Sequence, residues 1–481
     1  MGKSLFDKTQ NKVFKDITPE GFAPVFKKAL EDPKTKLTNP KVIQAYYSSN
    51  DYDPTFLMEH LANNDLNVLP DYLAKASEHG LDPKMFQTEK LKSLLARFYD
   101  KKAIKTTDEA YEDMAQLELT IANSLINYSN ALQFGVMNPR RIYANYYTAT
   151  KRPDSISMSS VFAVKSLKTF LDSIQPKDSQ YVTLQKALIS NVIVPGLTKE
   201  ETQRTLLVNL ERLRWKNKPS ESRYVLVNIP AFELDLMDGG KSTLNMKVCV
   251  GEGRNNDRSD NLVEYDESDK VDRPFQRETP QLNSEIYVAE VNPIWNIPQS
   301  IAGKEIIVEA AKDKYYLANK NINVYKNEKL VDDPETIDWA SISDSEKAEY
   351  SFKQQPGEDN SLGKVKFLFK NSSSVYLHDT PAKLAFNKPV RAVSHGCVRL
   401  EKPLDFAHAL FGDGPKYNLI AKYMGEDKPE PTSVMLNKKM PVYITYVTCW
   451  AEPGGNLQFR KDVYGLDIVL YAHLQKFLAN I

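Results

Sequence analysis

Hydrophobic positions in the first 215 residues recur at helical spacing, and few runs alternate as strands do. One apolar stripe consists of Leu91, Leu94, Leu95 and Phe98. The same helical spacing is seen in Leu73, Ser77 and Leu81, which follow a Pro70-Asp71 start. It is seen again in Val161, Val164, Leu167 and Leu171, a pattern that ends before Pro176. Side chains three or four positions apart share one face of a helix, and proline cannot continue a helix. The pattern predicts an α-helical scaffold domain over residues 1–215.

From Tyr224 the pattern becomes that of a strand, with residues 224, 226 and 228 on one face and residues 225, 227 and 229 on the other. Gly239-Gly240 supplies a turn before residues 244–250, which predicts a hairpin. Further alternating runs lie at 285–291, 364–369 and 442–447, and helical pieces lie near 404–411 and 469–478. The predicted fold class is α+β, in which a mainly β domain over residues 222–481 follows the helical one.

Two segments interrupt the β pattern. Residues 299–354 are rich in charge and tyrosine and precede the residues with candidate chemistry. Long insertions often form lids over active sites, so a lid is predicted here, and a subdomain that only covers surface is the alternative. Residues 252–273 are polar and acidic, which is typical of a mobile loop.

Composition narrows the classes of function. The 481 residues hold 63 Lys plus Arg against 63 Asp plus Glu, so no global field attracts nucleic acid, and no nucleic-acid partner is predicted. A hydrophobic content of 41% is ordinary for a folded protein of two or three domains. No run of 18 uncharged apolar residues occurs, and the first residues lack the apolar core of a signal peptide. Taken alone, this pattern predicts a cytoplasmic protein.

Cysteine is scarce, with only Cys249, Cys397 and Cys449. Three cysteines are too few for a disulfide framework and show no metal-binding CxxC spacing. Cys249 and Cys449 lie in alternating runs and are interpreted as small buried hydrophobic residues, although a disulfide between them stays open. Cys397 differs because it lies in the basic, glycine-containing turn of residues 393–400, VSHGCVRL.

His378, in the block YLHDTP of residues 376–381, completes a candidate thiol nucleophile with a base. An imidazole that takes the proton of a thiol gives the thiolate needed to attack a carbonyl. His378 is the preferred base because strand spacing would turn it and Tyr376 to the same face, whereas His395 would shape the pocket or donate to substrate. The pattern therefore indicates an acyl-transfer enzyme.

The residues around this pair have candidate roles of their own. The N–H groups of Gly396 and Cys397 could stabilise an oxyanion, and Tyr376 is either a further donor or a half-buried strand aromatic. Arg399 would bind a substrate carboxylate or pair with a local acid, and Ser394 is interpreted chiefly as stabilising the turn. His378, His395 and Cys397 could also ligate zinc, but their spacing matches no common zinc pattern. No metal and no cofactor are predicted.

These blocks resemble the catalytic domain of the L,D-transpeptidases of bacterial cell walls. The resemblance extends to residues 223–234 (RYVLVNIPAFEL), 291–298 (VNPIWNIP), 355–357 (QPG) with Leu362-Gly363, and 441–446 (PVYITY). Their order resembles the large branch of the family, which has a helical scaffold before the catalytic domain. The resemblance implies that a backbone carbonyl, rather than Asp379, holds the far nitrogen of His378. It also favours Trp295 as a wall of the substrate groove over a packed turn.

The resemblance further implies a function. Cys397 would attack a tetrapeptide stem of peptidoglycan, release the terminal D-alanine and pass the acyl group to an amine of a neighbouring stem in a 3→3 cross-link. Carbapenems would acylate the same sulfur. The location implied is the periplasm or cell envelope, so we expect that a signal segment or membrane anchor is missing from the chain. Resolution of the thioester by water or by a protein amine, and a non-catalytic scaffolding role, are the alternatives.

Overall fold

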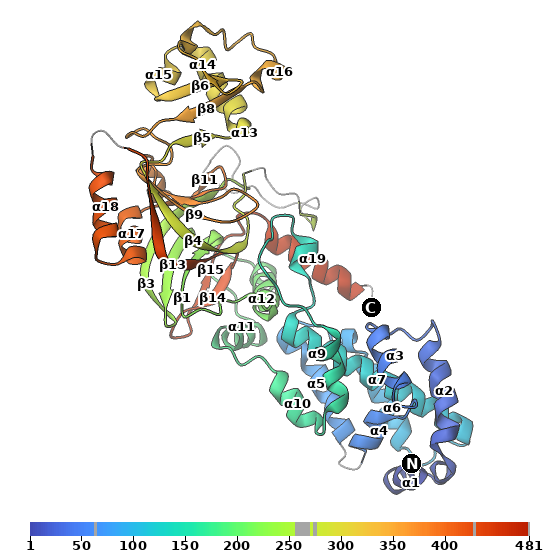
Figure 1. Ribbon diagram of the computed structural model, residues 1–481. Coiled ribbons are helices and arrows are strands. Elements are labelled where there is room, and N and C mark those ends of the chain that lie inside the picture. Colours follow the sequence, from blue (N-terminus) through green and yellow to red (C-terminus); the bar gives the residue numbers. More distant parts are fainter. Residues whose placement is uncertain (62–64, 255–269, 273–276, 427–429, 480–481) are drawn as a thin grey trace.

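The computed structural model describes residues 1–61, 65–254, 270–272, 277–426 and 430–479. Most of the predicted 252–273 loop lies outside these described residues. Figure 1 shows an elongated molecule, with a helical half that contains the N-terminus, a β barrel in the middle and a small subdomain beyond it. The predicted α+β class is therefore confirmed. Among the described residues, no helix is both long and apolar enough to cross a membrane.

The helical half packs around one central helix, α7 (Thr107–Phe134), which is buried on most of its surface and contacts α2, α4, α6 and α12. Thr106 caps the N-terminus of α7, because its side chain accepts the Glu109 N–H. The remaining helices are α1 (Gly2–Thr9), α2 (Pro19–Glu31), α3 (Pro40–Ser48), α4 (Thr55–His60), α5 (Val68–Ala74), α6 (Thr88–Tyr99), α8 (Pro139–Ile142), α9 (Ser155–Ser159), α10 (Leu167–Ile174), α11 (Ser179–Ile189) and α12 (Lys199–Arg214).

Two of the three predicted helical stripes need correction. The stripe of residues 91–98 lies on α6 as expected. The stripe after Pro70 is not one helix, because α5 starts at Val68, ends at Ala74 and continues only as 3-10 helix to His79. The third stripe is interrupted by an extended segment before α10, where the Ser166 side chain caps the new helix by accepting the Thr169 N–H. Local capping overrides the apolar periodicity there.

The β half is one sheet that closes on itself. Its strand order is β11-β3-β12-β10-β9-β4-β13-β1-β2, and a pairing of β2 with β3 completes the ring. The predicted hairpin is confirmed as β2–β3, with Gly239 and Gly240 both in the left-handed region, as a tight turn requires. The strands are β1 (Arg223–Asn228), β2 (Glu233–Asp238), β3 (Lys241–Gly251), β4 (Leu282–Val291), β9 (Val365–Phe369), β10 (Leu377–His378), β11 (Ala392–Ser394), β12 (Val398–Leu400) and β13 (Thr432–Thr445).

Two helices cover the barrel near β13 and β4, namely α17 (Pro403–Phe411) and α18 (Pro415–Met424). The hairpin of β14 (Cys449–Ala451) and β15 (Leu457–Phe459) and the C-terminal helix α19 (Leu466–Ala479) pack against α11 and α12, so the chain returns to its helical half. Figure 1 shows α19 running from the barrel toward the scaffold helices.

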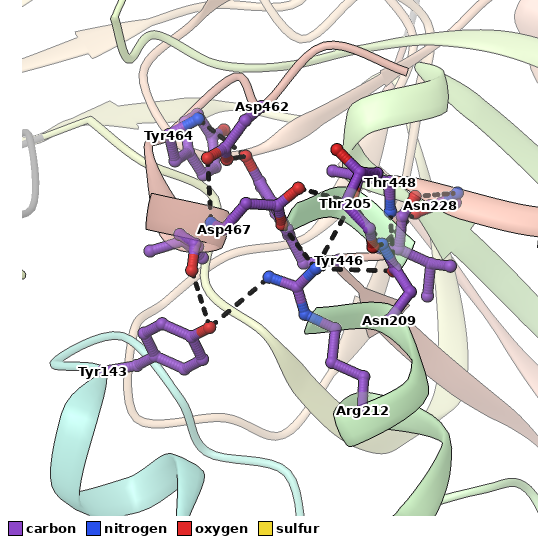
Figure 2. Close-up of polar contacts among 12 residues, drawn as sticks. Tyr143, Thr205, Asn209, Arg212, Asn228, Tyr446, Thr448, Asp462, Tyr464 and Asp467 are labelled. Atoms are coloured by element: carbon purple, nitrogen blue, oxygen red, sulfur yellow. Dashed lines mark hydrogen bonds and ion pairs between the residues drawn. The ribbon is translucent and has the colours of Figure 1, made fainter. Parts of the chain in front are cut away.

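A buried ion pair fastens this return (Figure 2). Arg212 Nη1 of α12 lies 2.5 Å from Asp467 Oδ1 of α19, and both side chains are almost fully buried. The hydroxyl of Thr448 donates to Asp467 Oδ2 at 2.7 Å and accepts from Asn209 Nδ2 at 2.7 Å. Burial raises the pKa of Asp467 to about 6, although Arg212 opposes this shift. Separating α12 from α19 would leave a buried charge without its partner, which raises the free energy. The pair therefore stabilises the contact between these two helices.

The 299–354 insertion is a subdomain with its own apolar core, which includes Trp339 and Phe352. Its sheet has the order β5-β8-β6-β7, and β5 and β8 join it to the barrel. The subdomain begins just before residue 299, with β5 (Trp295–Ile297). Its other elements are α13 (Gln299–Ile301), a π-helical turn (Ala302–Ile306), α14 (Ile307–Lys312), α15 (Tyr316–Asn319), β6 (Ile322–Lys326), β7 (Lys329–Leu330), α16 (Asp344–Lys347) and β8 (Tyr350–Gln354).

Candidate active site

Strand register brings the candidate histidine and cysteine to one face of the barrel. The short strand β10 pairs in parallel with β12, so that Leu377 lies beside Val398, and His378 beside Arg399. Leu377 and Val398 are fully buried in the barrel core. Because side chains alternate along a strand, His378 and Arg399 point to the opposite face, together with Cys397 just before β12. His378 and Cys397 are therefore diagonal neighbours on that face.

Cys397 follows a tight turn that is held by side chains on both sides. Gly396 has a φ of 111°, in the left-handed region that favours glycine. Ser394 Oγ accepts the Gly396 N–H at 3.2 Å and donates to the Cys397 carbonyl at 2.6 Å, while Thr279 Oγ1 donates to the Gly396 carbonyl at 2.8 Å. No hydrogen bond among the described residues uses the Cys397 N–H. That N–H is the donor still open to a ligand.

His378 is buried and oriented by the main chain. Its Nδ1 lies 2.5 Å from the carbonyl oxygen of Asp379. A carbonyl can only accept, so Nδ1 carries the proton and Nε2 of the neutral ring is left as a base. The Asp379 carboxylate is used elsewhere, because it accepts the Lys364 N–H at 2.8 Å and pairs with Lys383 at 2.5 Å. A Cβ at Gly363 would lie 2.4 Å from that carboxyl group, so this close packing needs glycine.

Burial keeps both candidate groups, the Cys397 thiol and the His378 imidazole, neutral at rest. It raises the pKa of the Cys397 thiol to about 11, although the Tyr376 hydrogen bonds and the charges of Arg399 and Lys366 oppose the shift. It lowers the pKa of the His378 imidazole to about 3, and Arg399 adds to that effect. The sequence favoured a thiolate through nearby positive charge, but desolvation outweighs that charge here. The resting pair is a thiol and a neutral imidazole.

Tyr376 connects the thiol to a charged pair on the neighbouring strands. Burial and the adjoining Cys397 sulfur, which hydrogen-bonds with the phenol, raise the pKa of Tyr376 well above its usual value. Its ring lies edge-on to that of His378, at 5.6 Å between centroids, and Lys366 Nζ lies 5.6 Å from its centroid. Lys366 in turn pairs with Glu290 of β4 at 2.7 Å. The phenol therefore keeps its proton beside the sulfur.

All of the candidate side chains named from the sequence line one cavity of about 550 Å³. They are Trp295, Tyr376, His378, Ser394, His395, Cys397 and Arg399. Ser394 is nevertheless 1% exposed, and its hydroxyl is occupied within the turn, which fits the stabilising role and leaves no hydroxyl for a substrate. The insertion contributes Ile301, Lys304 and Tyr316 to the same cavity, so it forms part of the wall. Pockets of this size hold small ligands or peptide segments.

His395 faces the insertion. Its Nε2 lies 2.7 Å from Glu305 Oε1, in the π-helical turn, and the same oxygen accepts from Arg277 Nη2 at 2.7 Å. Arg277 also reaches Glu252 with its Nη1 at 3.1 Å. The cluster joins the turn before Cys397 to the insertion. Sequence reasoning missed Glu305, Arg277, Lys366 and Glu290, because their contacts depend on pairings that are distant in the chain.

The remaining cysteines have no chemical role in this site. Cys249 lies in a small cluster with Phe386 and Val393, and Cys449 packs against α11 and α12. Both are buried free thiols, so the disulfide left open by the sequence does not form. Among the described residues, no group of three or more His, Cys, Asp or Glu side chains is arranged to hold a metal ion.

Comparisons with known proteins agree with this architecture. A sequence model of a scaffold domain matches residues 41–188, and one of the L,D-transpeptidase catalytic domain matches residues 222–413. A protein of Haemophilus influenzae named "Putative L,D-transpeptidase" is 28% identical over 327 residues, which make up 68% of this chain and 61% of that protein. The match thus spans less than two thirds of that relative. In this chain a region that matches the L,D-transpeptidase catalytic domain thus follows a region that matches a scaffold domain.

Proposed function

We propose that the chain is a peptidoglycan L,D-transpeptidase in which Cys397 is the nucleophile and His378 the base. The observation that carries the proposal is the parallel register of β10 and β12, which turns both side chains into one cavity. Thiol acyl transfer needs a base beside the thiol. His378 fits this need, because its Nδ1 is fixed to a carbonyl and it lies beside Cys397 in its tight turn. The substrates are stem peptides of the wall, and the place of action is the cell envelope.

In the first half-reaction, the thiol proton moves to His378 Nε2 as the sulfur attacks the carbonyl of the third stem residue. Because the resting thiol is neutral, proton transfer and attack have to be coupled. The carbonyl oxygen gains the negative charge and is stabilised by the Cys397 N–H and the Tyr376 hydroxyl. The intermediate then breaks its bond to the terminal D-alanine, whose amine leaves with the proton from His378, and a thioester remains.

In the second half-reaction, an amine of a neighbouring stem attacks the thioester. His378 takes a proton from that amine, the carbon–sulfur bond breaks, and the thiol is restored when the proton returns to sulfur. The product is a 3→3 cross-link. Water in place of the amine would give a carboxypeptidase, and an amine of a protein would give attachment of that protein to the wall.

Acylation is tested by the intact mass of the full chain after exposure to a carbapenem. We expect a mass increase equal to one carbapenem molecule, its loss in Cys397→Ala, and its retention in Cys449→Ala, the matched control at a buried thiol. Labelling that persists in Cys397→Ala would refute the assignment of the nucleophile. It would also favour a scaffolding protein with a vestigial thiol.

The acceptor is tested with purified muropeptides and mass spectrometry. A dimer that lacks one D-alanine is the expected product, and it should be absent with His378→Ala. A tripeptide without any dimer would refute transpeptidation and support hydrolysis by the same thioester.

A further inference from the structure

A second cavity lies in the helical half, outside the candidate active site. It has a volume of about 390 Å³, within the range of ligand pockets. Its floor is α7, and its walls come from residues 36–39, from residues 84–87 and from Phe477 near the end of α19. Figure 1 shows α19 ending beside the scaffold helices. We call this cavity the scaffold groove.

Three asparagines form the floor of the scaffold groove. Asn123, Asn127 and Asn130 are spaced i, i+4 and i+7 on α7, so they share one face. Asparagine is a poor helix former, and a row of three within a 28-residue helix calls for a reason. Part of that reason is structural, because Asn127 Oδ1 accepts from Asn39 Nδ2 at 3.1 Å and its Nδ2 donates to the Thr38 hydroxyl at 2.8 Å.

The other two asparagines keep hydrogen-bonding atoms open to the scaffold groove. Asn123 is 2% exposed, and its Oδ1 accepts the Thr38 N–H at 2.9 Å. Asn123 lines the groove, and its Nδ2 makes no hydrogen bond among the described residues. The half-buried Asn130 makes no side-chain hydrogen bond within the described chain. The floor therefore offers amide donors and an amide acceptor.

The rim adds strain and positive charge. Gln87 has a φ of 53°, a conformation that side chains other than glycine, asparagine and aspartate rarely adopt. Backbone strain of this kind persists only where the surrounding structure stabilises it, and it is found most often at functional sites. Lys36 and Lys84 line the rim, and neither pairs with a carboxylate in the part of the chain that the structure describes. No described acidic residue lines the scaffold groove.

Phe477 supplies an apolar surface in the same cavity as these amides. Its side chain is 37% exposed, although it lines the cavity. A half-exposed aromatic ring beside amides suits a ligand with flat apolar patches between polar groups. Pyranose rings with acetamido substituents have this chemistry, since their C–H faces are apolar and their edges carry hydroxyl and amide groups.

We propose that the scaffold groove binds an N-acetylated amino-sugar chain, such as the glycan strand of the wall. This inference rests on the proposed function, because that function supplies a polymer with acetamido sugars and nearby carboxylates. The amides of Asn123 and Asn130 hydrogen-bond the acetamido groups, Phe477 stacks on a sugar face, and the two lysines attract carboxylates of attached stems. The scaffold groove thereby binds a glycan strand while Cys397 reacts with the stem peptides attached to it.

A peptide ligand fits the scaffold groove less well. Extended peptides usually bind along an unpaired strand edge or present an amphipathic helix to an apolar groove. The groove is built from helices and loops, and its floor is polar.

Isothermal titration calorimetry of the full chain with the β-1,4-linked tetramer of N-acetylglucosamine tests the proposal. We expect saturable binding that weakens about tenfold in Asn130→Leu, since an amide that bonds the ligand is lost, and weakens also in Phe477→Ala. The control is Gln116→Leu, an exposed position on the same helix outside the groove, which should bind as the wild type does. The deacetylated tetramer should bind more weakly than the acetylated one.

Three results would overturn the proposal: no binding to the wild type, equal affinity for wild type and Asn130→Leu, or stronger binding of a free stem peptide than of the tetramer. Carbapenem acylation of Cys397 should be unchanged in every groove variant. That readout separates the two proposals, because a failure of the proposed function removes acylation from the wild type without affecting sugar binding.

Discussion

The neutral resting state of the Cys397–His378 pair predicts how the thiol responds to pH. With a pKa of about 11, about one thiol in 10⁴ is ionised at pH 7, and this fraction grows tenfold with each unit up to pH 10. The imidazole, with its pKa near 3, stays neutral above pH 5 and adds no further step. Alkylation of Cys397 by iodoacetamide should therefore accelerate about tenfold per pH unit from pH 6 to pH 10, because the thiolate is the reacting form.

The assay is the rate of carbamidomethylation of the Cys397 peptide, followed by mass spectrometry at each pH. The buried Cys249 of β3 and Cys449 of β14 serve as internal references for unfolding, since they become reactive only if the structure around them opens. His378→Ala should leave this profile unchanged while it abolishes acylation by substrate. The opposite result would be an alkylation rate that is constant from pH 6 to pH 9 and falls below pH 6, with that fall absent in His378→Ala. It would show a preformed thiolate–imidazolium pair and refute the reasoning.

Three further substitutions test other contacts. Arg399→Met should raise the pKa of the Cys397 thiol, since the Arg399 charge lowers it, and alkylation at pH 8 should slow in proportion to the lost thiolate, about tenfold if the pKa rises by one. Arg212→Met should lower the free energy of unfolding by about 3–5 kcal/mol in urea titrations, because Asp467 is left buried without its partner. That loss should be largest above pH 6 and shrink toward pH 4, since burial raises the pKa of Asp467 in the folded state and protonation removes its charge. Gly363→Ala should lower the free energy of unfolding by about 1–3 kcal/mol and slow carbapenem acylation. The reason is that Gly363 has a φ of 62° and that a Cβ would displace the segment after His378. An unchanged free energy of unfolding would contradict the packing described.

Local pattern was sufficient for the parts of the molecule that depend on neighbours in the chain. The alternation from Tyr224 and the glycine pair at 239–240 predicted β1, β2 and β3, because strand period and turn chemistry are local properties. The turn around Cys397 and the block around His378 are local patterns too, and they supplied the two side chains that the proposed function uses. Helical boundaries were less predictable, as the break before α10 shows, because one capping side chain there outweighs a regular apolar stripe.

By itself, then, the sequence determined the fold class and the approximate positions of the longer strands of the barrel, and it offered Cys397 and His378 as the candidate thiol and histidine. Only the tertiary structure decided which residues surround that pair. The strand register brought Lys366 beside His378, and the packing of the insertion brought Glu305 to His395, 90 positions away. It also decided the charge state, because the pKa of a thiol or an imidazole depends on the water excluded around it, and that burial exists only once the chain has packed.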